Sequence, residues 1–294
     1  MTDSFLSRAA TAARSISLRA EPSVRAGTLA YDADIVTGWH RHDLHQLEYA
    51  LEGVAEVETA AGRYLLPPQQ AIWIPAGLEH SNTLRGVHSA SVFFDPAMFP
   101  GDPGDRARVL AAAPPLREMI IYALRWPITR EAADERADVY FAALALVVED
   151  CLHQEQPLWL PTSDDPLIAS VISYTERHLA TVTAEDIRRD LNISERTLRR
   201  RFPEATGMTW RAFVAQARLI KAMAALARPG STVLDVALSV GFDSPSSFSR
   251  AFRAFTGHTP AGYRRHSQQR ATVPPRPVPA AYRPRTEATD MRHT

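Results

Sequence analysis

Apolar residues near the C-terminal end of the chain follow a helical spacing that occurs twice, at an offset of 50 residues. Leu198 and Phe202 are four positions apart in the first copy, and Phe248 and Phe252 repeat this spacing in the second. Such spacing places each pair on one face of a short helix. A serine that favours a helix start precedes each copy, and a glycine that favours a helix end follows it. The pattern therefore predicts two equivalent short helices.

A second helical segment precedes each of these short helices. Residues 183–186 form a capping-box-like start for the first segment, and residues 233–240 are rich in apolar side chains. Asn192 and Gly241 then supply residue types that accept the left-handed backbone of a tight turn. Two helices joined by a short turn describe a helix-turn-helix unit, so the chain is predicted to contain two of them.

The segment between the two units is predicted to be one continuous helix. Residues 210–227 contain no proline or glycine and carry apolar groups at helical spacing. Pro229 and Gly230 end that helix. Pro203 departs from the pattern, because its ring would clash with the carbonyl four residues earlier. The first short helix is therefore expected to end or bend near Phe202.

The N-terminal half shows a strand pattern followed by two amphipathic helices. Residues 24–95 consist of short apolar segments broken by glycine and proline, which is typical of β-strands. Residues 114–126 and 133–153 have helical length, with Val139 and Leu146 on one side. These helices either cover the β-structure or form a dimer interface, and we favour the interface.

Charge divides the chain in the same way as the hydrophobic pattern. The net charge of the 294 residues is zero, but residues 164–270 carry 16 Lys and Arg against 10 Asp and Glu. Residues 1–163 carry 13 against 21, and residues 271–294 carry 4 against 2. The basic excess favours a nucleic-acid partner for the C-terminal part. An excess of six charges is modest, so the two predicted helix-turn-helix units are the stronger indication.

The cysteine content, the hydropathy and the composition of the terminal segments indicate the cellular compartment and the character of the two ends of the chain. The single cysteine, Cys151, excludes an internal disulfide and suits a reducing cytoplasm. No stretch approaches the ~20 apolar residues of a membrane span, so a cytoplasmic protein without a membrane partner is expected. Residues 1–20 are expected to form an N-terminal arm, and the Pro- and Arg-containing residues 267–294 a disordered tail.

The run from Gly241 to Arg264 resembles the signature of the AraC/XylS family of bacterial transcription regulators, and the resemblance extends over residues 165–265. It implies two helix-turn-helix units bridged by a long helix. Such a pair would bind double-stranded DNA in two successive major grooves per protomer. The positions that contact bases in this family are occupied here by Arg196, Arg200, Ser246, Ser247 and Arg250.

Two polar clusters in the strand-like part, at residues 38–53 and 75–82, resemble the two motifs of the cupin barrel. A cupin is a small antiparallel β-barrel with a central pocket, and it is the usual sensing domain of the same regulator family. The residues expected to line an effector pocket are His40, His42, Gln46, Glu48 and His80.

The same cluster is a candidate metal site. His40, His42 and Glu48 share even numbering, so a continuous strand would aim them at one face. The resemblance implies that these residues, with His80, could hold a divalent metal such as Zn, Fe, Ni or Mn. The acidic ligand of the family falls one or two positions earlier, where this chain has Gln46 and Leu47. The alternative is therefore a pocket that binds an organic effector without metal.

These patterns predict an α+β protein. It would consist of an N-terminal antiparallel, cupin-like β-barrel with flanking helices and an all-α double helix-turn-helix domain. The expected boundaries are the arm at 1–20, the barrel at 21–104, a helical segment at 105–156, a linker at 157–166, the DNA-binding domain at 167–266 and the tail at 267–294.

The expected function is regulation of transcription by a small-molecule effector bound in the barrel. A homodimer without enzymatic activity is expected, with RNA polymerase as a partner if the protein is an activator. Two alternatives remain open: a regulator for which the metal itself is the signal, and a cupin metalloenzyme with a DNA-binding appendage. An enzyme would have no need of residues 183–264, which favours regulation.

Overall fold

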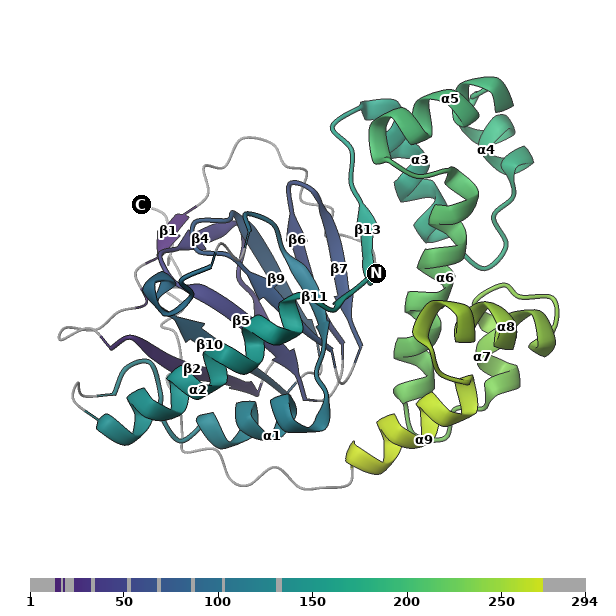
Figure 1. The fold of residues 1–294 in the computed structure, drawn as a ribbon. Coiled ribbons are helices and arrows are strands. Elements are labelled where there is room, and N and C mark those ends of the chain that lie inside the picture. Colours follow the sequence, from purple (N-terminus) through teal and green to yellow (C-terminus); the bar gives the residue numbers. More distant parts are fainter. Residues whose placement is uncertain are drawn as a thin grey trace, which may run out of the picture.

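The computed structural model contains a β-rich N-terminal part and a helical C-terminal part that lie side by side (Figure 1). This arrangement confirms the predicted α+β class. Apart from residues 14–16, 18 and 267–271, the predicted arm and tail lie outside the described residues. The structure describes residues 14–16, 18, 24–32, 35–51, 54–67, 70–85, 88–101, 104–130 and 134–271.

The strands of the N-terminal part form two sheets. The first has the order β1-β4-β9-β6-β7-β13, with β3 also paired to β9, and the second has the order β12-β11-β8-β5-β10-β2. All of these pairs are antiparallel except β1 with β4. The bounds in the first sheet are β1 Arg14–Ile16, β3 Ile35–Val36, β4 His40–His42, β6 Val54–Thr59, β7 Gly62–Leu66, β9 His80–Arg85 and β13 Trp159–Pro161. Those in the second are β2 Ala26–Asp32, β5 His45–Ala50, β8 Gln70–Ile74, β10 His88–Phe94, β11 Arg108–Ala111 and β12 Glu155–Gln156.

The predicted barrel differs from the structure in one respect, because the described strands form two sheets rather than one closed cylinder. β1 and β13 are the edges of the first sheet, and β12 and β2 are the edges of the second. Closure would need hydrogen bonds between those edges. The two sheets instead meet through side chains packed between them.

The two central strands of the second sheet, β5 and β8, are buried along their whole length. Leu47 and Trp73 belong to the cluster that includes the outer helices, whereas Ile72 and Ile74 belong to the core shared with the first sheet. Side chains alternate between the faces of a strand, so burial at every position means that both faces are covered. The even-numbered residues of β5 therefore face the first sheet.

Helices α1 (Pro114–Ala123) and α2 (Glu135–Leu152) lie on the outer face of the second sheet (Figure 1), and the 3-10 helix η1 spans Pro96–Met98. Phe141 of α2 packs edge-on against Phe94 of β10, with ring centroids 6.3 Å apart. Val139 and Leu146 lie on another face of α2 and remain 66% and 65% exposed. The helix thus covers the sheet and still presents an apolar stripe.

Two of the predicted segments contain strands that the sequence did not indicate. The segment 105–156 contains strands β11 and β12 as well as the two helices, and the predicted linker 157–166 contains β13, which pairs with β7. Leu158 and Leu160 are the cause, because both side chains are buried in the core. A segment that buries apolar groups in this way becomes part of the domain.

The C-terminal part follows the predicted order of helices. Their bounds are α3 Pro166–Arg177, α4 Ala184–Leu191, α5 Glu195–Thr206, α6 Trp210–Ala227, α7 Val233–Ser239, α8 Pro245–Thr256 and α9 Pro260–Ala271. α9 continues past the expected boundary at residue 266, so the first residues of the predicted tail are helical. Among the described residues, no helix combines the length and apolar character that crossing a membrane requires.

The prediction that Pro203 ends or bends the first short helix near Phe202 was wrong at the helix end, because α5 continues to Thr206. Pro203 lies in the last turn, where its missing N–H removes a single bond to the carbonyl of Arg199. The backbone N–H of Gly207 donates to the Pro203 carbonyl over 2.9 Å and closes the helix. The two short helices are therefore equal in length.

Candidate DNA-binding surface and histidine cluster

The helices α5 and α8, called the recognition helices below, begin and end in the same way. The Ser194 hydroxyl accepts from the N–H of Thr197 at 3.1 Å, and the Ser244 hydroxyl accepts from the N–H of Ser247 at 3.2 Å. Each helix ends at a glycine with φ of 74°. Leu198 and Phe202 in α5, and Phe248 and Phe252 in α8, are buried as predicted. Burial of the same face orients both helices alike.

The opposite faces of the recognition helices carry most of the predicted base-contacting residues. Arg196, Arg200, Ser246 and Arg250 are exposed. Arg200 lies 3.9 Å from Glu204 one turn later, whereas Arg196 and Arg250 make no hydrogen bond or ion pair with other described residues. Unpaired guanidinium groups on a helix surface are available for phosphate or base contacts.

Two residues near this surface are engaged inside the protein. The hydroxyl of Ser247 donates to the carbonyl of Ser244 at 2.8 Å, so it serves the helix cap. The guanidinium group of Arg201 donates to the carboxylate of Asp165, the residue that caps the start of α3, at 2.6 Å. Both side chains therefore form hydrogen bonds within the protein in this conformation.

The three histidines predicted to line one site do come together. His40 and His42 lie on β4, His80 begins β9, and the ring centroids of His40 and His80 are 4.2 Å apart. The Nδ1 atoms of His40, His42 and His80 contact the carbonyls of Gly38, Leu44 and Leu78 at 2.9, 2.7 and 2.8 Å. Since a carbonyl only accepts, each Nδ1 must carry the proton. Each Nε2 then presents a lone pair.

Burial keeps these rings neutral. Desolvation lowers the pKa values of His40 and His42, against smaller opposing effects of their hydrogen bonds. The pKa of His80 falls to about 3, first because it is buried and second because His40 lies beside it. The Nε2 atom of His80 is buried without a hydrogen-bond partner among the described residues. An unpaired buried acceptor of this kind is costly unless a ligand satisfies it.

Gln46 and Glu48 lie beside the histidines but interact differently. Oε1 of Gln46 is 2.9 Å from Nε2 of His42, while its Nε2 donates to Glu48 at 3.0 Å. The hydroxyl of Ser91 on β10 also donates to the carboxylate of Glu48. Burial raises the pKa of Glu48 against these hydrogen bonds. Ser91 belongs to neither sequence motif, so no sequence signal identified it.

One ring nitrogen from each of the three histidines lies within 4.8 Å of the others, and Glu48 is outside this group. Adjacent nitrogens on a tetrahedral zinc ion are about 3.4 Å apart, so small ring movements would bring them onto one ion. His Nδ1–H groups held by carbonyls are the usual outer support of metal-binding histidines. The residues therefore fit a divalent metal. His45, in contrast, packs on Trp73, with ring centroids 4.8 Å apart, on the other face of β5.

The two parts of the chain meet where α6 crosses β13. The Gln216 side chain donates to the carbonyl of Trp159 at 2.6 Å and to that of Pro157 at 3.1 Å. Arg63 on β7 forms an ion pair with Glu176 on α3. Neighbouring strands of the first sheet, β9, β6, β7 and β13, thus connect His80 with the helix between the two units.

Two family models match the chain. The AraC-like ligand binding domain matches residues 23–94, and the helix-turn-helix domain matches residues 187–266. These ranges contain the histidine cluster and both recognition helices.

The chain also resembles individual proteins to different degrees. The chain is 30% identical over 228 residues to the HTH-type transcriptional regulator NimR of Escherichia coli K12, covering 76% of this chain and 81% of that protein. It is 30% identical over 139 residues to the HTH-type transcriptional activator RhaR of the same organism, covering 47% and 49%. ToxT from Vibrio cholerae O395 is 13% identical over 86% of this chain and all of its own, with a TM-score of 0.35. On the evidence of the family models and NimR, the chain belongs to the AraC family of DNA-binding transcriptional regulators with an N-terminal ligand-binding domain.

Proposed function

We propose that this regulator responds to a small-molecule effector bound at the histidine cluster and reads two successive major grooves with α5 and α8. The observation that carries the proposal is the set of three buried, neutral histidines inside the ligand-binding domain, each with one ring nitrogen within 4.8 Å of the others. A buried polar cluster with an unsatisfied acceptor is a place where a ligand gains binding energy.

The proposed DNA contacts rest on the equivalence of the two units. Arg196 and Arg200 on α5, and Ser246 and Arg250 on α8, occupy the exposed face. The bridging helix α6 has 18 residues, which at 1.5 Å per residue is about 27 Å. This length is of the same order as the ~34 Å between successive major grooves on one face of DNA. If the regulator activates transcription, RNA polymerase is its further partner.

Effector binding would reach the DNA-binding domain through the first sheet. A ligand changes DNA affinity only if it binds two states of the protein differently. The path from His80 on β9 through β6, β7 and β13 ends at the carbonyl that Gln216 holds. A shift of β13 would therefore move α6, which carries both units.

Genome-wide mapping of bound DNA in the native host would identify the operator, and the genes beside the strongest site would suggest the effector. In the full-length protein, His40→Ala and His80→Ala are then expected to abolish the response to that effector. Their DNA affinity without effector should match the wild type, because both residues belong to the ligand-binding domain and neither is part of α5 or α8. A His40→Ala/His80→Ala protein that still responds fully would remove the cluster from the mechanism.

A specific contact favours metal as the signal or as part of the site. The side-chain amide of Gln46 lies 2.9 Å from Nε2 of His42, so an ion bound by the histidines would also lie near the Gln46 oxygen. Gln46 would then supply the oxygen ligand expected from Glu48. Metal analysis after equilibrium dialysis with Zn²⁺ should give one ion per chain and at least ~10-fold weaker binding in His80→Ala. His45→Ala is the matched control, and equal losses in both variants would exclude this site.

Metal sensing and effector sensing make different predictions for DNA binding. If the metal is the signal, Zn²⁺ alone should change the affinity for the operator. If the metal only supports an organic effector, Zn²⁺ alone should leave that affinity unchanged.

We further propose that the regulator is a homodimer held by α2. Val139 and Leu146 are seven positions apart on the exposed face of this helix, so two copies of the stripe could pack against each other about a two-fold axis. Leu146→Asp is expected to shift the protein to monomers in sedimentation analysis. Arg136→Asp, on an exposed polar position of the same helix, should not, and a dimer that survives Leu146→Asp contradicts the proposal.

A further inference from the structure

A partly buried contact between the two helix-turn-helix units supplements the bridging helix. Arg218, near the middle of α6, donates from Nε to the carbonyl of Leu179 at 2.9 Å and from Nη2 to that of Ala180 at 3.2 Å. These carbonyls belong to the segment that leads from α3 into the first unit. Its third donor, Nη1, reaches the carbonyl of Gly241 at 2.8 Å, in the turn of the second unit. One guanidinium group therefore binds both units.

The two units also touch directly at this point. Gly241 has φ of 91°, and a Cβ atom placed on it would lie 2.1 Å from the carbonyl oxygen of Ala180. It would also lie 2.9 Å from Cζ of Arg218. Only a residue without a side chain permits this approach, so the glycine is required by contact between units as well as by the turn. We call the set of Ala180, Arg218 and Gly241 the interunit joint.

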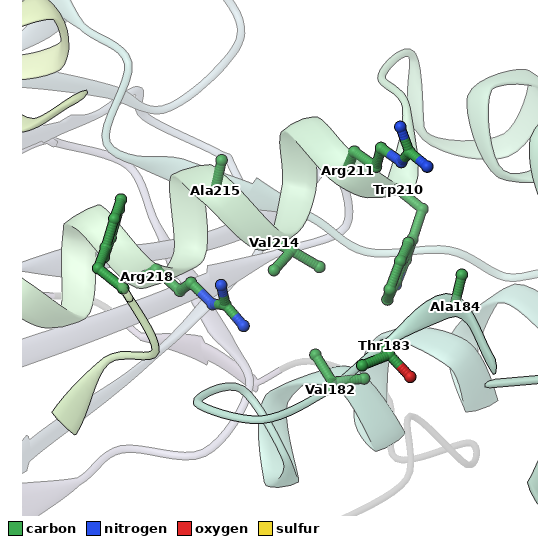
Figure 2. Close-up of a pocket in the computed structure, with 9 residues that line it drawn as sticks. Val182, Thr183, Ala184, Trp210, Arg211, Val214, Ala215 and Arg218 are labelled. Atoms are coloured by element: carbon green, nitrogen blue, oxygen red, sulfur yellow. The ribbon is translucent and has the colours of Figure 1, made fainter. Parts of the chain in front are cut away.

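Beside the joint the units are separated by a cleft. Val182 and Thr183 of the first unit and Phe242 of the second line it, with α6 as its floor. Figure 2 shows Arg218 projecting from α6 toward Val182 and Thr183, whereas Arg211 points away from them. Close-packed side chains do not fill this space, so the joint is positioned to resist a swing of one unit toward the other.

We infer that the interunit joint fixes the spacing and rotational phase at which α5 and α8 enter DNA, and thus selects operators with one spacing between their two half-elements. A helix alone fixes the distance between the units along its axis, but rotation about α6 also depends on what the units touch. One extra base pair moves the second half-element by about 3.4 Å and rotates it by about 35°. A rigid joint cannot follow both changes. This inference rests on the proposed reading of two grooves.

The guanidinium geometry makes Arg218 a positioning residue that lysine cannot replace. Arginine presents its donors in a planar fork, and three carbonyls from two units match three of them. A lysine ammonium keeps the charge on a flexible stem without that fork. Loss of spacing selectivity in Arg218→Lys would therefore identify the fork, rather than charge, as the cause.

The test is selection of bound sequences from random DNA duplexes by the full-length wild type, Arg218→Ala, Arg218→Lys and Arg211→Ala. The wild type is expected to select two half-elements at one spacing and to lose at least ~10-fold in affinity when one base pair is inserted. Both Arg218 variants should select several spacings and lose less than ~3-fold on the same insertion. Arg211→Ala removes an exposed arginine from the same helix and should keep the wild-type spacing.

The outcomes separate this inference from the proposed function. If the wild type selects single, ungapped elements, the reading of two grooves fails. If it selects one spacing and the Arg218 variants keep that spacing with lower overall affinity, Arg218 only stabilises the fold and the inference is wrong. Should Arg218→Ala fail to fold in a melting experiment, Arg218→Lys decides between these outcomes.

Discussion

Arg250→Ala is expected to weaken binding to the operator by about 10- to 100-fold and to weaken binding to unrelated DNA much less. Arg250 is exposed on α8 and has no partner among the described residues, so its guanidinium is free to enter a groove. Arginine can bond O6 and N7 of one guanine, and this pairing discriminates by ~1–3 kcal/mol. The reduction should therefore be concentrated at one position of the operator.

Arg253→Ala provides the matched control for this prediction. Arg253 is also exposed, lies three residues later on the same helix and carries the same charge. Losing a contact to phosphate weakens all sequences alike and reduces the salt dependence of binding. Titrations of both variants on operator and random duplexes would measure the difference. Equal losses of Arg250→Ala on both duplexes would assign Arg250 to the DNA backbone.

The helical part could be predicted closely from the sequence because its signals are local. A serine cap, an apolar pair four residues apart and a glycine end each act within one helix, and the structure confirms them at Ser194, Ser244, Gly207 and Gly257. The effect of Pro203 was misjudged because the penalty depends on how many turns follow the proline. In α5 the helix ends at Thr206, within one turn of Pro203, so the penalty is small.

The sequence correctly predicted an antiparallel β-domain, but it did not predict that the strands form two sheets instead of a closed barrel. Alternation along a strand shows which residues share a face, and it correctly grouped His40 and His42. Which strands become edges depends on pairing between segments far apart in the chain. β13, for example, lies almost a hundred residues after its partner β7 and fell in the predicted linker. No pattern within a single segment predicts a pairing between segments so far apart in the chain.

The candidate site illustrates the same limit. The motif brought His40, His42 and His80 together, but it could not show that Glu48 accepts hydrogen bonds from Ser91 and Gln46 and lies outside the group of three histidines. That arrangement depends on the register between β5 and β10, which pairs Glu48 with Ser91. The interunit joint could not be predicted from the sequence either. Arg218 donates to backbone carbonyl groups, and because every residue has one, no residue type marks its partners.

Acidification in metal-free buffer is expected to destabilise the ligand-binding domain between pH 6.5 and pH 3. The pKa of His80 is about 3 in the folded protein against 6.5 for an unburied histidine. In that interval the unfolded chain binds the proton more readily, so stability is complete above pH 6.5 and is lost as the pH falls toward 3. For His80 alone, the loss between pH 7.5 and pH 5 amounts to about 2 kcal/mol. The lowered pKa values of His40 and His42 act in the same direction.

Protonation of Glu48 is expected to offset part of this loss of stability at low pH, and variants can measure its share. Its pKa is raised by burial, so the folded protein holds the proton more tightly and gains stability as the pH falls toward the ordinary value of 4.5. Urea unfolding at pH 7.5 and pH 5 should therefore show a smaller pH effect in His80→Asn and a larger one in Glu48→Gln than in the wild type. His178→Asn, at an exposed position, should match the wild type. A pH effect that is unchanged in His80→Asn would mean that His80 accepts a proton in the folded protein, and the convergence of three neutral histidines would then be wrong.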